Sequence, residues 1–212
     1  PYSNKLTELL QSLSATLDAD SGSKYAVERE VNNVLIVAIT SNRGLCGAFN
    51  SNIIKQTNVL INDVYGDKNV SVLAIGKKAN DAFAKQDRVI ANKSEVFDDL
   101  TFDNVSQIAE MLMDKFVAGD FDKIELVYNN FKNAATQIIM TEQFLPISRM
   151  ESEANANLDY LFEPSKLEIV ETLIPKSLKT QLYKGIRDSF ASEHGARMTA
   201  MHKATDNATE LR

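Results

Sequence analysis

A glycine-containing stretch early in the chain has the composition of a ligand-binding turn. It reads SNRGLCGAFN over residues 41–50 and follows an apolar run that is typical of a buried strand. Backbone amides beside Gly44 and Gly47 could approach a phosphate, because α/β proteins place such ligands between a strand and the next helix. The spacing matches neither GxxxxGK[ST] nor GxGxxG. We therefore favour a tight strand-to-helix turn with Arg43 on its surface, and a small nucleotide-binding α/β domain is the alternative.

The other reactive side chains do not combine into a catalytic or metal-binding set. Cys46 is the single cysteine, so it cannot form an internal disulfide, and it is expected to be a small apolar filler. His194 and His202 stand eight residues apart, whereas two helical ligands of one metal ion are three or four apart. The sequence therefore predicts no catalytic residue, no metal and no cofactor.

Composition and charge narrow the class of protein. The chain has 212 residues, of which 44% are hydrophobic and 25% charged, which is ordinary for a globular domain. Its net charge of −6 argues against a general nucleic-acid binder. The longest apolar run, Val34–Ile39, falls far short of the roughly 20 residues of a membrane-spanning helix. Residues 176–212 carry more basic than acidic side chains, which favours a tail that enters a negatively lined partner.

The middle of the chain alternates strand-like and helix-like stretches. This alternation predicts an open, mainly parallel Rossmann-like sheet with helices on both faces. The last two strands are close enough in sequence to form a hairpin through residues 129–133, which gives one antiparallel edge. Asp103 is the expected N-cap of the third helix and Gly119 its expected end. The predicted strands are 34–39, 70–75, 89–97, 123–128 and 136–145, and the predicted helices are 50–64, 77–85 and 102–118.

Both ends of the chain carry apolar residues at helical spacing. Five leucines between residues 6 and 17 form one stripe, and a second stripe runs from Leu178 to Leu211. Because proline is tolerated in the first turn of a helix, we expect a break at Pro175 and a long helix from Lys176. A helix of about 55 Å cannot rest on a body with a radius of gyration of about 14 Å, so it must project. We expect the two terminal helices to pair as an antiparallel coiled coil.

Three segments, taken in order, resemble one known family. Residues 41–52 (SNRGLCGAFNSN) are similar to the strand-turn-helix signature of the gamma subunits of rotary, F-type ATP synthases. Residues 159–164 (DYLFEP) and 192–207 (SEHGARMTAMHKATDN) are similar to two further segments of that family. The resemblance covers the whole chain. It implies a fragment that lacks both far ends of the coiled coil, divided into residues 1–20 (N-terminal helix), 21–165 (globular α/β domain) and 166–212 (C-terminal helix).

The resemblance also implies a role and partners. Family members form the central stalk, a rotor shaft that couples rotation of a membrane c-ring to conformational change in a ring of alpha and beta subunits. The implied location is peripheral, on the cytoplasmic side of a bacterial plasma membrane. The implied contacts with the alpha/beta ring are Arg197, Met198, Met201, Thr205, Asp206 and Asn207. The implied contacts with the epsilon subunit and the c-ring are Asp159, Tyr160, Phe162 and Glu163. The family loop motif comprises Arg43, Gly44, Leu45, Cys46 and Gly47.

Overall fold

A five-stranded sheet organises the described part of the chain. The computed structural model describes residues 24–147 and 166–211. The strands lie in the order β3-β2-β1-β4-β5; the first four are mutually parallel, and β5 is antiparallel to β4. Their bounds are β1 Asn33–Ile39, β2 Asn69–Ile75, β3 Val89–Asn92, β4 Lys123–Asn133 and β5 Thr136–Leu145. The side chains of Val34–Ile39 are fully buried, as a central strand covered on both faces requires. The predicted sheet with one antiparallel edge is confirmed.

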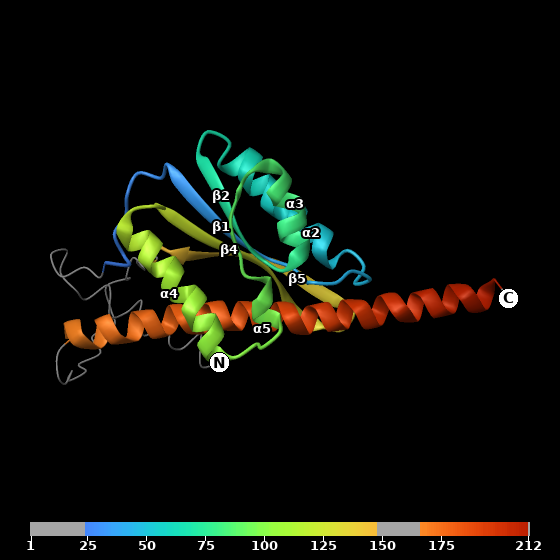
Figure 1. The fold of residues 1–212 in the computed structure, drawn as a ribbon. Coiled ribbons are helices and arrows are strands. Elements are labelled where there is room, and N and C mark those ends of the chain that lie inside the picture. The colour runs from blue at the N-terminus through green and yellow to red at the C-terminus, as the bar shows by residue number, and fades with distance from the viewer. Residues whose placement is uncertain (1–23, 148–165, 212) are drawn as a thin grey trace, which may run out of the picture.

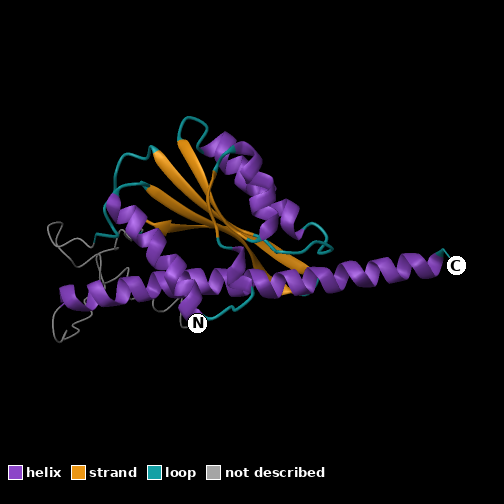
Figure 2. Cartoon of the chain, viewed as in Figure 1, coloured by secondary structure: helices purple, strands orange, loops and turns teal. Residues whose placement is uncertain are grey.

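Helices cover both faces of this sheet (Figures 1 and 2). On one face lie α2 (Phe49–Val59), which continues as a π-helical segment over Leu60–Val64, and α3 (Lys77–Phe83). On the other face lie α4 (Phe102–Ala118) and α5 (Lys166–Glu210). The larger apolar core lies between the sheet and the α4/α5 layer.

Two predicted boundaries in the α/β part are wrong for local reasons. Strand β3 ends at Asn92, and Ser94–Phe97 form a 3-10 turn, because the Asn92 side chain accepts a hydrogen bond from the Ser94 amide at 3.1 Å. Thr101, not Asp103, caps α4: its backbone is extended, and its hydroxyl accepts from the Asn104 amide at 3.3 Å. The predicted end of α4 is confirmed.

The β4–β5 hairpin is longer than predicted. The strands pair as far as Asn133 and Thr136, so residues 129–133 belong to β4 instead of to a connecting loop. The turn is closed by the Asn133 side chain, which accepts from the amides of Ala135 at 3.0 Å and Thr136 at 2.8 Å. The sheet therefore extends towards α5 at this corner.

Helix α5 begins earlier than predicted. It starts at Lys166, and Pro175 lies inside it, where it removes one backbone hydrogen bond. The neighbouring residues Ile174, Leu178 and Leu182 are buried in the core beneath the sheet, and this packing outweighs the local penalty. The 45 residues of α5 span about 67 Å.

The burial of α5 changes along its length. Between Ile174 and Ala196 buried side chains recur at helical spacing, so this part of the stripe packs on the body. Every residue from Met201 to Glu210 is exposed, and Figure 1 shows this end extending past the body. The predicted projection is confirmed for the last three turns, whereas the first half of the stripe needs no outside partner. The partner helix predicted at residues 1–20 lies outside the described residues.

Candidate functional site

Two sequence motifs that are far apart in the chain meet where α5 leaves the body. The Arg197 guanidinium donates to the backbone carbonyl of Gly44 at 3.4 Å, across 153 residues of sequence. Beside this bond, Cys46, Phe49 and Ala196 form a small buried apolar cluster. The loop of residues 42–48 is therefore a support for α5.

The loop of residues 42–48 is held by its own hydrogen bonds. The Asn50 side chain accepts from the Ser41 amide at 2.9 Å, and its NH₂ group lies 3.2 Å from the Cys46 sulfur. The Ser41 hydroxyl donates to the Arg43 carbonyl. Leu45 and Gly47 both have positive φ, 61° and 58°, which folds the loop tightly. The segment is a structured turn, as the sequence predicted.

The β4–β5 hairpin contacts a different side of α5. The Ser192 hydroxyl donates to the carbonyl of Asn129 at 3.2 Å, and the Thr199 hydroxyl lies 3.1 Å from the carbonyl of Ala134. A Cβ atom on Gly195 would lie 3.0 Å from the Cα of Ala134, so glycine permits the close approach of helix and turn. Ten residues earlier in α5, Gly185 packs at ordinary van der Waals distance against the Tyr128 ring of β4.

The crevice that α/β proteins use for ligands is occupied by α5 in this chain. In the strand order β3-β2-β1-β4-β5, β2 and β3 are added on one side of β1 and β4 on the other, so the order of the parallel strands switches between β1 and β4. Ligands of doubly wound sheets bind at the carboxyl ends of the strands at such a point. Here Phe49 and Ala196 pack together at this edge, and the Asn129 side chain donates to the Phe49 carbonyl at 3.3 Å. The alternative of a nucleotide-binding domain is therefore not favoured. Among the described residues, no group of three or more His, Cys, Asp or Glu could hold a metal ion.

The residues predicted to contact the alpha/beta ring fall into two classes. Arg197 is half-buried and forms an ion pair at 2.5 Å with Glu193, which is only 8% exposed. The others have exposed or half-exposed side chains along the end of α5: Met198, Met201, Thr205, Asp206 and Asn207. In the loop motif Arg43, Gly44, Leu45 and Gly47 are exposed and Cys46 is buried. Asp159, Tyr160, Phe162 and Glu163 lie outside the described residues.

Sequence reasoning missed four residues at this junction. They are Ala134, Glu193, Gly195 and Thr199, which contact either Arg197 or each other. Two of them left a signal: Glu193 stands four residues before Arg197, the spacing of a helical ion pair, and Gly195 interrupts a helical pattern at a cost of about 1 kcal/mol relative to alanine. Ala134 carried no signal, because only the folded hairpin brings it to the helix.

A polar layer lies between α5 and the sheet. The Asn130 side chain donates to the Asp188 carboxylate at 2.8 Å, and the Tyr128 hydroxyl donates to Glu142 at 2.8 Å. Burial raises the pKa of Asp188; Lys184 opposes this effect and the Glu142 carboxylate adds to it. Burial likewise raises the pKa of Tyr128, so the phenol is neutral. The helix is thus positioned by directional bonds as well as by apolar packing.

A second buried polar cluster lies on the opposite face of β4. The Tyr65 hydroxyl donates to Glu125 at 2.8 Å, and the Lys123 ammonium lies 3.2 Å from the same carboxylate oxygen. Burial raises the pKa of Tyr65. Because Tyr65 directly follows the π-helical segment, this cluster fixes the end of α2 on the sheet.

The rest of the surface offers no membrane-crossing element in the described residues. None of the helices over 24–147 and 166–211 combines the length and the apolar character that a bilayer crossing requires.

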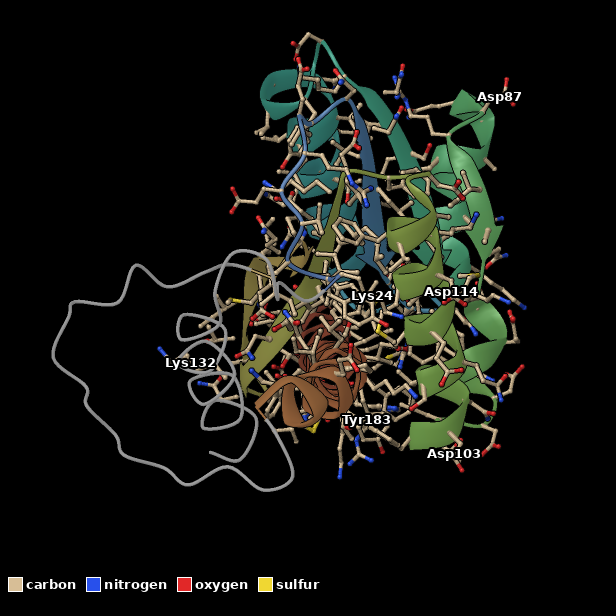
Figure 3. The ribbon with its side chains drawn as sticks, turned by 90° about the vertical axis from the view of Figure 1, so that its left-hand side faces the viewer. Lys24, Asp87, Asp103, Asp114, Lys132 and Tyr183 are labelled. Atoms are coloured by element: carbon tan, nitrogen blue, oxygen red, sulfur yellow. The ribbon has the colours of Figure 1, made fainter. Side chains whose placement is uncertain are left out.

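Figure 3 looks along α5 and places Tyr183 between this helix and the N-terminal end of α4, near Asp103. The rings of Tyr183 and Phe102 meet edge to face, with centroids 5.5 Å apart. Helix α4 therefore packs against one side of α5 through this ring contact.

Comparison with known proteins agrees with this architecture. The family model described as ATP synthase matches residues 1–212. The ATP synthase gamma chains of Flavobacterium psychrophilum and Flavobacterium johnsoniae are 68% and 66% identical to the chain over its whole length, and the match covers 74% of each relative. The chain thus spans about three quarters of these relatives.

Solved structures share the fold. A chain of the Tetrahymena thermophila mitochondrial ATP synthase, central stalk and c-ring, has a TM-score of 0.65 at 20% identity, with 97% of this chain and 100% of that chain covered. A chain of the Euglena gracilis mitochondrial ATP synthase rotor has a TM-score of 0.66 at 24% identity, with 95% and 77% covered. Because the family model matches all 212 residues and two relatives are about two-thirds identical, this chain belongs to the ATP synthase gamma chain family.

Proposed function

We propose that this chain is the central-stalk, or rotor-shaft, part of a proton-driven ATP synthase and carries out no bond chemistry of its own. In this role it couples rotation of a c-ring to conformational change in a catalytic ring of alpha and beta subunits. The observation that carries the proposal is the division of α5, whose residues 174–196 pack on an α/β body and whose last ten residues, 201–210, are all exposed.

A helix with one part packed on the body and one end exposed can act as a rotating shaft. A projecting helix that continues a docked helix transmits rotation of the body to whatever surrounds its free end. Inside a ring of equivalent sites, an asymmetric helix contacts each site differently, and only such differential contact can bias the conformation of otherwise equal sites.

The exposed side chains near the end of α5 are the proposed contacts with the alpha/beta ring. Met201 and Asp206 are the best candidates, because neither supports the body and a methionine adapts to a moving surface. The full set is Arg197, Met198, Met201, Thr205, Asp206 and Asn207. Arg197 has a second role as the partner of Glu193, so its substitution would disturb the body as well.

The remaining assignments rest on the family resemblance. We propose that Asp159, Tyr160, Phe162 and Glu163 contact an epsilon subunit and the c-ring. We further propose the functional division into residues 1–20, 21–165 and 166–212, and a peripheral location on the cytoplasmic side of a bacterial plasma membrane. The solved neighbours include assemblies described as rotor and as OSCP/F1/c-ring, which supports a c-ring and a catalytic ring as partners.

The proposal is tested with Met201→Ala and Asp206→Ala in the complete gamma chain, assembled with its partner subunits in membrane vesicles. We expect each variant to lower the rate of proton-driven ATP synthesis about five-fold, the factor that corresponds to one lost contact of about 1 kcal/mol. Thermal unfolding should be unchanged, because exposed side chains away from the body affect stability by less than about 0.5 kcal/mol.

Asp114→Ala is the matched control, since it removes the same side chain from the exposed face of α4. It should leave synthesis at the wild-type rate. Wild-type rates in both α5 variants would refute the ring contacts, and a wild-type gamma chain that fails to assemble with alpha and beta subunits would refute the proposed function itself. Calorimetry with ATP and ADP on the isolated chain should detect no tight binding, since α5 fills the crevice of the sheet.

A further inference from the structure

Two stiff turns contact α5 at the point where it leaves the body. One is the loop of residues 42–48, which reaches Ala196 and Arg197; the other is the turn of the β4–β5 hairpin, which reaches Gly195 and Thr199. Beyond them, every α5 residue from position 201 to position 210 is exposed. Among the described residues, these contacts are thus the last ones before the projecting end of α5.

The two turns support different sides of the helix. At 3.6 residues per turn, the direction shared by Gly195 and Thr199 lies about 130° from the direction shared by Ala196 and Arg197. Contacts on a single side would let the helix tilt or roll away, whereas contacts on two sides resist both movements. Figure 3 places Lys132, next to the hairpin turn, on the opposite side of α5 from α4.

Each support is internally braced. The hairpin turn is closed by the two bonds to the Asn133 side chain, at 3.0 and 2.8 Å. The loop of residues 42–48 is tied by the Asn50 side chain and the Ser41 hydroxyl. On the helix itself, the Glu193–Arg197 ion pair holds the guanidinium towards the loop. A braced turn moves little under load, so force on the helix passes into the sheet.

We propose that these two turns, residues 42–48 and 133–136, form a collar that transfers torque between the α/β body and the projecting end of α5, residues 201–210. The inference deepens the proposed function and rests on it. The collar fixes the base of the shaft, so the angle of the exposed helix follows the angle of the body. Thr199 and Cys46 are positioning residues in this device, one for each support.

The test measures torsional stiffness in the complete gamma chain assembled with alpha and beta subunits. The ring is fixed to a surface, and a probe is attached to the body through a cysteine at Asp87, which is exposed at the outer end of the body (Figure 3). Three variants are compared with the wild type. Thr199→Val removes the hydroxyl near Ala134, and Cys46→Ala removes the thiol from the apolar cluster. The third variant combines both substitutions. The readout is the angular variance of the probe while the complex waits for ATP.

We expect each single variant to increase the angular variance and the double variant to increase it about two-fold, since weakening parallel supports lowers their combined stiffness. Thr180→Val is the matched control, because Thr180 makes the same intrahelical bond, to Lys176, and has no contact with either turn. It should give the wild-type variance. Thermal unfolding verifies that the variants are folded, and Thr199→Val alone suffices if the double variant is not.

The outcomes distinguish a failure of the collar from a failure of the proposed function. Wild-type variance in Thr199→Val and in the double variant, with normal ATP-driven rotation, would overturn the collar and leave the proposed function intact. A wild-type probe that never rotates with ATP would overturn the proposed function and the collar with it. A variance increase that Thr180→Val reproduces would also overturn the collar, because the effect would then belong to the helix alone.

Discussion

Replacing each of two glycines of α5 by alanine should have different effects on stability. Alanine is favoured over glycine in a helix interior by about 1 kcal/mol. At Gly185 the new Cβ would lie 3.5 Å from the Tyr128 ring, an ordinary contact that adds up to about 0.8 kcal/mol of burial. At Gly195 it would lie 3.0 Å from the Cα of Ala134 and 3.3 Å from the Phe131 ring, and such overpacking costs about 1 to 3 kcal/mol. Gly185→Ala should therefore be stabilising, and Gly195→Ala neutral or destabilising.

The difference between the two variants is the quantity that tests the geometry. It amounts to about 1 to 4 kcal/mol, which separates the midpoints of thermal unfolding by about 2 to 15 °C for a chain of this size. Circular dichroism at a helical wavelength during heating, on both variants and the wild type, measures it directly. Because both substitutions have the same intrinsic helix preference, equal stabilisation by the two would refute the close approach of the hairpin turn to α5.

Three further substitutions test other contacts. Asp188→Asn should raise the unfolding midpoint at pH 7 but not near pH 3. The pKa of the Asp188 carboxyl is raised in the folded state, so its ionisation lowers the stability of the wild type as the pH rises through that pKa. An equal gain at both pH values would contradict this reasoning. Tyr65→Phe should lower the free energy of unfolding by about 1.5 to 3 kcal/mol in urea titrations, because it removes a bond to the buried Glu125 carboxylate, and an unchanged value would exclude that bond. Thr101→Ala should cost about 1 kcal/mol in the same assay and Thr101→Ser much less; equal losses would exclude the cap on the Asn104 amide.

The elements that sequence reasoning predicted well have strong local signals. The run Val34–Ile39 is apolar without interruption, which fits a strand covered on both faces. Gly119 ends α4 in the left-handed conformation, with φ of 86°, as its residue type suggests. The apolar stripe after Leu178 predicted a long helix, and the excess of its length over the size of the body predicted the projection.

The features that the sequence left hidden depend on tertiary packing. Pro175 reads locally as a helix start, yet α5 continues through it because residues on either side are buried beneath the sheet. The contact of Gly44 with Arg197 joins segments 153 residues apart, and no periodicity encodes such a pairing. The candidate ring contacts at the end of α5 came from the family resemblance, since exposed helical positions look alike in a single sequence.

The continuity of α5 has a consequence for how its free end becomes ordered. A lone peptide as short as residues 201–210 would be mostly random coil in water, because initiating the first turn is unfavourable and helices below about 12 to 15 residues are marginal. Here the preceding turns are already wound against the strands, so each further residue adds only a propagation step. The buried part therefore acts as a seed, and fraying should start at the C-terminus and fade towards Ala196.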